Sequence, residues 1–348
     1  MSEAKACILS VSGQKLTSGE RALLSDAKPW GVILMGRSCG SPEQVRGLVD
    51  EMWGAIGRPV LVFIDQEGGR VARLKPPNWP TFPPAARYGE IYRRNRELGI
   101  EASWLGHRLL AAELEALGIH ADCAPDVDLL HAGAHSVIGD RSFGAETEMV
   151  GVLAKAALEG LAAGGVAGVI KHMPGHGRAE VDSHEAMPVV RASREELARD
   201  IEAFRFVSDA AMGMTAHLAF TEIDGETPAT LSSKIITDVI RGEIGFDGLL
   251  MTDDIGMNAL GGSLAERTKR AMDAGCDVVL HCSGFVKEPE EILREMTEVA
   301  EAAPELSGKS MARAQAAERA SLQLAPFDRA DGWVRFEELL AGGGQPVA

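Results

Sequence analysis

The chain has 348 residues, of which 45% are hydrophobic, and this is enough to bury the core of one α/β barrel or of two ordinary domains. Its formal net charge of −16 argues against nucleic acid or a polyanionic surface as a partner, because like charges repel. A soluble protein with a small or neutral substrate is therefore expected.

The cysteines and the N-terminal residues indicate the compartment. The five cysteines show no C-x-x-C spacing, which predicts neither a disulfide framework nor a zinc knuckle and suits a reducing cytoplasm. The opening MSEAKACILSVSG has too short an apolar run for a signal peptide, and no segment approaches the length of a membrane span. We expect a cytoplasmic protein without membrane contact, with a monomer favoured over an oligomer.

Apolar, β-prone runs alternate along the chain with segments of 3.6-residue hydrophobic periodicity. Eight strands are predicted, at residues 7–11, 31–35, 60–65, 121–125, 168–172, 213–217, 248–253 and 277–282. The helices between and after them are predicted at residues 18–27, 42–56, 92–117, 147–163, 193–211, 232–244, 264–274 and 289–302.

Alternating strand–helix units with almost continuously apolar strands predict an α/β fold, a (β/α)8 TIM barrel with its helices outside. A doubly wound open sheet is the alternative, but no G-x-G-x-x-G follows the first strand and no Walker sequence occurs. We assign residues 1–325 to a single barrel domain, with an additional helix over residues 311–324. Residues 326–348 end in a glycine-rich stretch and are predicted to form a partly disordered C-terminal tail.

In such barrels the chemistry sits at the carboxyl ends of the strands. Polar residues follow six of the predicted strands, so we expect them to converge on one mouth, although any one of them could be satisfied within the barrel. They are Asp65, Asp122 with Asp126, Lys171 with His172, His217, Asp253 with Asp254, and His281.

Asp65 is followed within a loop length by Arg70 and Arg73. A carboxylate acceptor beside guanidinium donors can bind the vicinal hydroxyls of a sugar, and a structural ion pair is the alternative. Arg141, in a glycine-punctuated loop after the fourth strand, is a second candidate donor, or a partner of its neighbour Asp140.

The stretch from Lys171 to Pro188 concentrates histidines and acidic residues around glycine and proline. Its Asp182-Ser-His184 segment puts a carboxylate and an imidazole at i and i+2, which orients a histidine for proton transfer in an extended backbone. A polar surface loop and a metal site are the alternatives.

Asp253, at the end of a buried strand, suits a nucleophile or a metal ligand. The first strand ends in Ser10-Val-Ser-Gly13, which lacks the His-x-His pair of metal-dependent barrel hydrolases. We therefore expect neither a metal nor any other cofactor. A carboxylate facing a loop that carries an Asp-supported histidine is the pair needed for double displacement at a sugar carbon.

Four motifs resemble the family 3 glycoside hydrolases, and more narrowly the bacterial single-domain β-N-acetylglucosaminidases. The resemblance runs from about residue 31 to residue 282, with all motifs in order. The motifs are IDQEGGRV at 64–71, KHMPGHG at 171–177 followed by DSH at 182–184, MTAH at 214–217, and GFDG followed by DD at 245–254. Met173, where phenylalanine is usual, and Met35-Gly-Arg37 depart from the pattern at the side of the substrate pocket.

The resemblance implies a barrel fold and a retaining mechanism. It also implies a covalent glycosyl-enzyme on Asp253, and an acid/base histidine, His184, assisted by Asp182. The sugar contacts that it implies are Asp65, Arg73, Arg141, Lys171 and His172.

The usual role of this subfamily is removal of non-reducing N-acetylglucosamine from cytoplasmic muropeptides, N-acetylglucosamine linked to 1,6-anhydro-N-acetylmuramic acid, during cell-wall recycling. Three alternatives remain: a β-N-acetylglucosaminide phosphorylase, another family 3 β-glycosidase, and a pure binding module. The last leaves the polarised histidine on a glycine-rich loop without a role.

Overall fold

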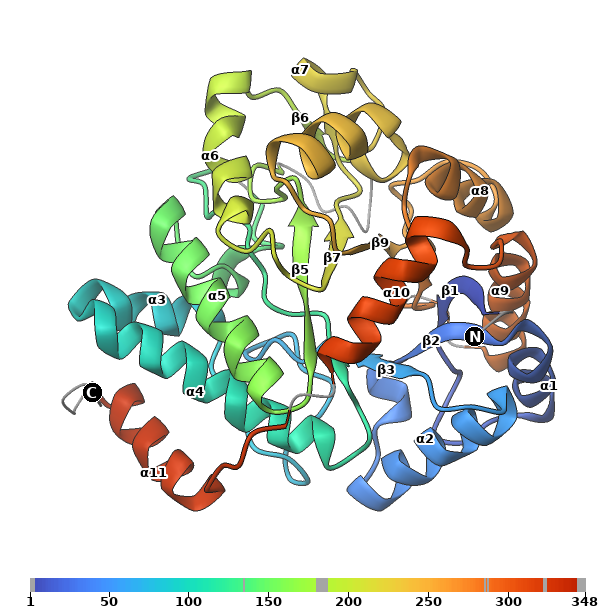
Figure 1. The fold of residues 1–348 in the computed structure, drawn as a ribbon, viewed down its shortest axis with the longest axis horizontal. Helices are drawn as coiled ribbons and strands as arrows, with labels where there is room; N and C mark the ends of the chain where they lie inside the picture. The colour runs from blue at the N-terminus through green and yellow to red at the C-terminus, as the bar shows by residue number, and fades with distance from the viewer. Residues whose placement is uncertain are drawn as a thin grey trace.

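The computed structural model describes residues 4–133, 135–179, 187–284, 286, 288–321 and 324–342. Eight parallel strands close into a barrel in the order β1-β10-β9-β7-β5-β4-β3-β2, and helices surround it, which confirms the predicted fold (Figure 1). The barrel strands are β1 (Lys5–Leu9), β2 (Pro29–Leu34), β3 (Leu61–Ile64), β4 (Ala121–Asp122), β5 (Ala167–Met173), β7 (Met212–Thr215), β9 (Leu249–Asp254) and β10 (Val278–His281).

Five helices have the predicted bounds, and three of them begin at a strong capping signal. Thr17 and Ser263 each form a capping box with the glutamate three residues on, and Ser41 caps a helix that starts with proline. These helices are α1 (Ser18–Ala27), α2 (Pro42–Ile56), α5 (Thr147–Ala163), α8 (Leu264–Ala274) and α9 (Pro289–Ala302).

Other elements differ from prediction. The helix predicted over residues 92–117 is two helices, α3 (Ala85–Arg94) and α4 (Arg96–Glu115), because Asn95 is extended and its side chain accepts from Leu98 N at 3.1 Å. Shorter elements fill the remaining connections. They are α6 (Arg194–Arg205), α7 (Thr221–Asp224), the 3-10 helices η1 (Gly36–Ser38), η2 (Gly139–Arg141) and η3 (Ala229–Leu231), the π-helix η4 (Ile235–Glu243), and a separate pair of strands, β6 (Val189–Val190) and β8 (Ala219–Phe220).

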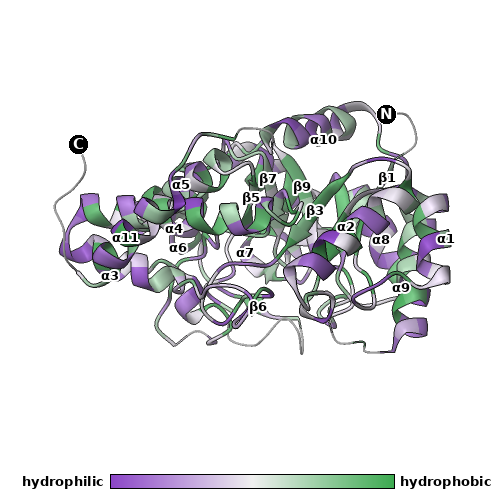
Figure 2. Ribbon diagram, turned by 90° about the horizontal axis from the view of Figure 1, so that it is seen from below, coloured by the Kyte–Doolittle hydropathy of each residue, from purple (hydrophilic) through white to green (hydrophobic). Residues whose placement is uncertain are grey.

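Successive residues of each strand point alternately into two apolar cores, one inside the barrel and one between the strands and the surrounding helices. In β3, Leu61 and Phe63 point into the barrel, whereas Val62 and Ile64 pack against the surrounding helices. Helix α10 (Gly308–Ala320) adds its buried alanines to the interior core and lies across one end of the barrel, while β6 and several connecting loops lie at the other (Figure 2). The site described below must therefore open at the end opposite α10.

The segment predicted as a tail contains a helix, α11 (Arg329–Leu340), which the sequence pattern did not predict. Phe336 is fully buried, and the Phe82 ring lies 5.4 Å from that of Trp333. Arg335 donates from Nε and Nη2 to Glu101 on α4 at 2.7 and 2.9 Å. This part of the tail is thus packed onto the barrel. No helix in the described part of the chain is long and apolar enough to cross a membrane.

Phe336→Ala should lower the free energy of unfolding by about 3–5 kcal/mol, because it leaves a cavity under α11. Val334→Ala, at a position 61% exposed on the same helix, should change it by less than about 0.5 kcal/mol. Urea unfolding followed by tryptophan fluorescence measures both. Equal, small effects would show that α11 contributes nothing to the stability of the barrel.

Candidate active site

A cavity of about 130 Å³ lies at the carboxyl ends of the barrel strands. Six of the eight predicted site residues line it, so the structure brings them together: Asp65, Arg73, Arg141, Lys171, His172 and Asp253. Glu67, His176 and an apolar wall of Val71, Val137, Met214, Leu280 and Cys282 complete the lining. The two remaining predicted residues, Asp182 and His184, lie outside the described residues.

The alternation of β3 points Asp65 into the barrel, where two cations hold it. Arg73 Nη2 donates to Asp65 Oδ2 at 2.9 Å, and Lys171 Nζ lies 3.3 Å from Oδ1. The buried Gln66 side chain accepts from the backbone N–H groups of Arg73 and Leu74 at 2.8 and 2.9 Å. This amide folds the loop after β3 back on itself and so brings Arg73 over Asp65.

Glu67 is a site residue that the sequence reasoning missed. Its Oε2 accepts from Arg141 Nε at 2.8 Å, and its Oε1 accepts from Arg141 Nη2 at 2.8 Å and contacts Lys171 Nζ at 2.6 Å. Burial would raise the pKa of Glu67, but the charges of Arg141 and Lys171 outweigh it and hold that pKa well below its usual range. All three groups are therefore charged at neutral pH. The only sequence signal for Glu67 is its place two residues after Asp65.

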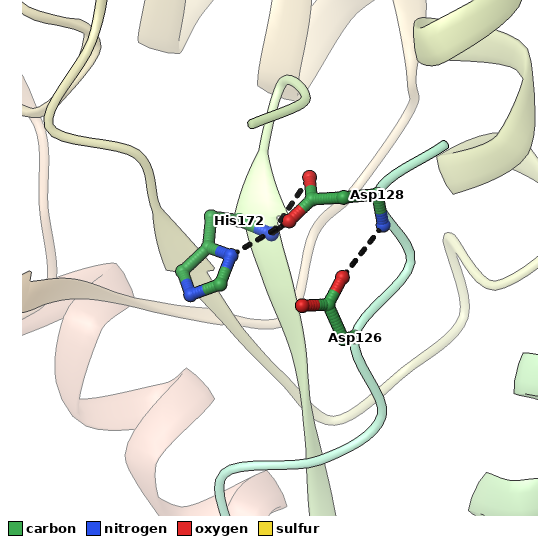
Figure 3. A group of neighbouring side chains, drawn as sticks. All are labelled: Asp126, Asp128 and His172. Carbon is green, nitrogen blue, oxygen red and sulfur yellow. Dashed lines mark hydrogen bonds and ion pairs between the residues drawn. The ribbon is translucent and has the colours of Figure 1, made fainter. Parts of the chain in front are cut away.

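Asp128 orients His172, as Figure 3 shows. His172 Nδ1 lies 2.7 Å from Asp128 Oδ2, and Asp126 Oδ1 accepts from Asp128 N at 2.9 Å. Burial, with the charge of Arg141, lowers the pKa of His172 to about 4, so the ring is neutral at pH 7. We assign the proton to Nδ1, which donates to the carboxylate and leaves Nε2 as an acceptor.

Asp126, Asp128 and His172 each bring a possible metal-ligand atom to within 4.8 Å of the others. Protein groups already engage both carboxylates, since Asp126 Oδ1 accepts from Asp128 N at 2.9 Å and Asp128 Oδ2 accepts from His172 Nδ1 at 2.7 Å. The neighbouring guanidinium of Arg141 also repels a metal cation. The arrangement therefore fits a hydrogen-bonded support for His172 better than a metal site.

Asp253 differs from the other carboxylates of the cavity because it forms no ion pair with any described residue. Its Oδ1 accepts from the backbone N–H of Asp254 at 2.8 Å. Burial would raise the pKa of Asp253, but the neighbouring His172 and His217, the Asp254 amide and the Lys171 ammonium outweigh it and lower that pKa to about 2. An ionised oxygen of Asp253 is thus available to a molecule in the cavity.

Several polar residues expected at the mouth do not line the cavity, so that prediction was wrong for them. Asp122 lies under the loop and accepts from Gln66 N at 2.9 Å, and His281 points away from the interior to Glu295 of α9 at 3.2 Å. His217 contacts Thr230 Oγ1 at 2.7 Å. In β4 and β10 the cause is alternation, because Ala121 and Leu280 already point inward.

Arg70 and Arg141, for which the sequence left either an ion pair or a sugar contact open, have different surroundings. Arg70 forms an ion pair with Asp140 at 3.0 Å in which both side chains are about half exposed, so it is a surface pair. Arg141 is paired with Glu67 and not with its neighbour Asp140.

Residues 2–319 match the sequence profile of the Glycosyl hydrolase family 3 N terminal domain. The chain belongs to glycosyl hydrolase family 3. It is 39% identical over 285 residues to a β-hexosaminidase of Alkalilimnicola ehrlichii, covering 79% of this chain and 80% of that one. A β-hexosaminidase of Thiobacillus denitrificans is 38% identical over 285 residues, covering 79% and 77%.

Among similar solved structures, NagZ of Neisseria gonorrhoeae in complex with N-trifluoroacetyl-D-glucosamine has a TM-score of 0.81 at 29% identity, with 97% of this chain and 96% of that chain covered. A family 3 β-N-acetylglucosaminidase of a Paenibacillus species has a TM-score of 0.83 at 28% identity, with 96% and 66% covered. Together these matches identify the chain as a glycoside hydrolase, a β-N-acetylhexosaminidase of family 3.

Asp122 supports a pH prediction. Burial raises its pKa to about 8, above the ordinary value of 3.8, so the folded state holds this proton more tightly than the unfolded state does. The stability that comes from this proton is complete below pH 4 and is lost as the pH rises through 8. Asp122→Asn does not titrate. Between pH 5 and pH 8 its free energy of unfolding should therefore rise by at least about 1.4 kcal/mol relative to that of the wild type.

Urea unfolding at the two pH values measures this difference, with Asp209→Asn, whose side chain is 76% exposed, as the control. A difference between wild type and Asp122→Asn that does not change with pH would contradict a protonated Asp122.

Proposed function

We propose that this family 3 enzyme is a retaining exo-β-N-acetylglucosaminidase that removes non-reducing terminal N-acetylglucosamine from muropeptides in the cytoplasm, during cell-wall recycling. The observation that carries the proposal is Asp253, an ionised carboxylate without a cation partner among the described residues, facing a cavity whose other charges are paired. The relatives named above support N-acetylglucosamine as the sugar.

The cavity suits a neutral, hydroxyl-rich ligand. Its lining carries three carboxylates, Asp65, Glu67 and Asp253, and three cations, Arg73, Arg141 and Lys171. Charges of both signs supply strong donors and acceptors to sugar hydroxyls without attracting a net charge. Because the cavity lies within the barrel rim and is closed below by the interior core, it suits the end of a saccharide.

In the proposed reaction Asp253 attacks the anomeric carbon while the protonated His184 gives its proton to the departing glycosidic oxygen. The bond to the leaving sugar breaks as the bond to the Asp253 oxygen forms. Neutral His184 then takes a proton from water, whose oxygen attacks the same carbon and releases Asp253 as a carboxylate. Asp182 orients the imidazole throughout. Two inversions at the anomeric carbon give net retention.

The described residues that flank the Asp182–His184 segment support its placement at the cavity. On one side, His176 lines the cavity and Ala179 O accepts from His135 N at 2.8 Å. On the other, Pro188 O accepts from Ala219 N at 3.0 Å, just past the carboxyl end of β7. Both flanks are thus anchored on the side of the barrel where Asp253 lies.

The direct test is release of p-nitrophenol from its β-N-acetylglucosaminide, with and without inorganic phosphate. We expect turnover with water as the acceptor and no N-acetylglucosamine 1-phosphate. A requirement for phosphate would instead identify a phosphorylase, and absence of turnover with tight sugar binding would identify a binding module.

Asp253→Asn should lower kcat by at least about four orders of magnitude, because the variant lacks the covalent catalyst. Asp247→Asn, at an exposed position before β9, should retain full activity. Steady-state kinetics measures both, and near-wild-type activity of Asp253→Asn would remove it from the role of nucleophile.

His184→Ala should reduce turnover of disaccharides far more than turnover of nitrophenyl glycosides, whose leaving oxygen needs little protonation. Asp182→Ala should show the same pattern more weakly, because the imidazole remains but is misoriented. Slow release of the sugar from Asp253 should also give a burst of nitrophenol. Equal losses on both kinds of substrate, without a burst, would move the acid/base group to another residue.

A further inference from the structure

Glu67 joins two successive connections and a strand of the barrel at the edge of the cavity. It lies in the loop after β3, Arg141 belongs to η2 after β4, and Lys171 is in β5. Arg141 binds both carboxylate oxygens of Glu67, and Lys171 Nζ lies 2.6 Å from the oxygen that also accepts from Arg141 Nη2. One carboxylate oxygen therefore holds two cations of the proposed sugar site side by side.

Among the described residues, the other acids beside the two cations lie farther from them than Glu67 does. The other acid beside Arg141 is Asp126, whose Oδ2 is 3.6 Å from Nη2, and the other acid beside Lys171 is Asp65, at 3.3 Å. Lys171 is 3% and Arg141 11% exposed, so water screens their mutual repulsion poorly. Without the negative charge of Glu67, the two cations would repel each other, and the space between them would attract another anion.

We propose that Glu67 is a positioning residue that sets Arg141 and Lys171 as a fixed pair of donors for the sugar. The inference rests on the proposed function for its substrate and adds a residue to that site. Glu67 acts as an internal anion, since its carboxylate occupies the place between the two cations that a free oxyanion would otherwise take.

This role has a consequence that a merely structural role lacks. If the carboxylate becomes a neutral amide, the side chain keeps its size but the two cations lose their counter-charge. They then form a site for a small oxyanion, so sulfate should become a competitive inhibitor of the variant. Wild-type enzyme should be insensitive, because Glu67 already satisfies both cations.

The test compares Glu67→Gln with Glu101→Gln, which removes the same charge from another bidentate arginine pair far from the cavity. For Glu67→Gln we expect KM for p-nitrophenyl β-N-acetylglucosaminide to rise about 10- to 100-fold, the effect of weakened charge-assisted hydrogen bonds, with a smaller change in kcat. Millimolar sodium sulfate should raise its apparent KM further. Glu101→Gln should match the wild type in both respects.

A folded Glu67→Gln variant with KM within about threefold of the wild type would overturn the inference. So would a raised KM without sulfate inhibition, because that result assigns Glu67 a purely structural role. If Glu67→Gln does not fold, Glu67→Asp retains the charge on a shorter side chain that cannot reach both cations. A raised KM with sulfate inhibition in that variant would support the inference, and wild-type kinetics would overturn it.

Calorimetric titration of sulfate separates this inference from the proposed function, because it requires no turnover. Sulfate binding to Glu67→Gln but not to the wild type would support the role of Glu67 even if the wild type failed to hydrolyse N-acetylglucosaminides. Equal binding to both proteins would overturn it.

Discussion

Burying several charges at one end of the barrel is stable only if each finds a partner, because transfer of an unpaired ion from water costs several kcal/mol. Arg73 and Lys171 share Asp65, while Arg141 and Lys171 share Glu67. The pairing fixes the directions of the donors before a substrate arrives. Asp253 is the exception, held by a backbone amide rather than a cation, and this leaves it reactive.

The barrel itself decides which side chains can join this cluster. Strand residues alternate between the interior and the helix layer, so a polar residue at a strand end reaches the cavity only in the inward register. Met251 points inward, which turns Asp253 the same way, whereas inward Leu280 turns His281 toward α9. Helix α10 covers the opposite end of the barrel and leaves the carboxyl end as the place for a ligand.

The sequence predicts the fold because the alternation of apolar strands and capped helices is local. It also predicts six residues of the cavity, because the motifs shared with the family identify site residues that local hydrophobic patterns do not. Glu67 and Asp128 were missed because their partners are far along the chain, with Arg141 74 residues after Glu67 and His172 44 residues after Asp128. His281 follows the inward Leu280 directly, so strand alternation turns it out of the cavity. Helix α11 was missed because its packing against Phe82 depends on tertiary contacts.

The stereochemistry of hydrolysis tests the role of Asp253 as a nucleophile most directly. Proton NMR can follow the first anomer of N-acetylglucosamine released from p-nitrophenyl β-N-acetylglucosaminide, before mutarotation equilibrates the two forms. Double displacement predicts that the β-anomer appears first. Initial formation of the α-anomer would show a single displacement by water and contradict the account.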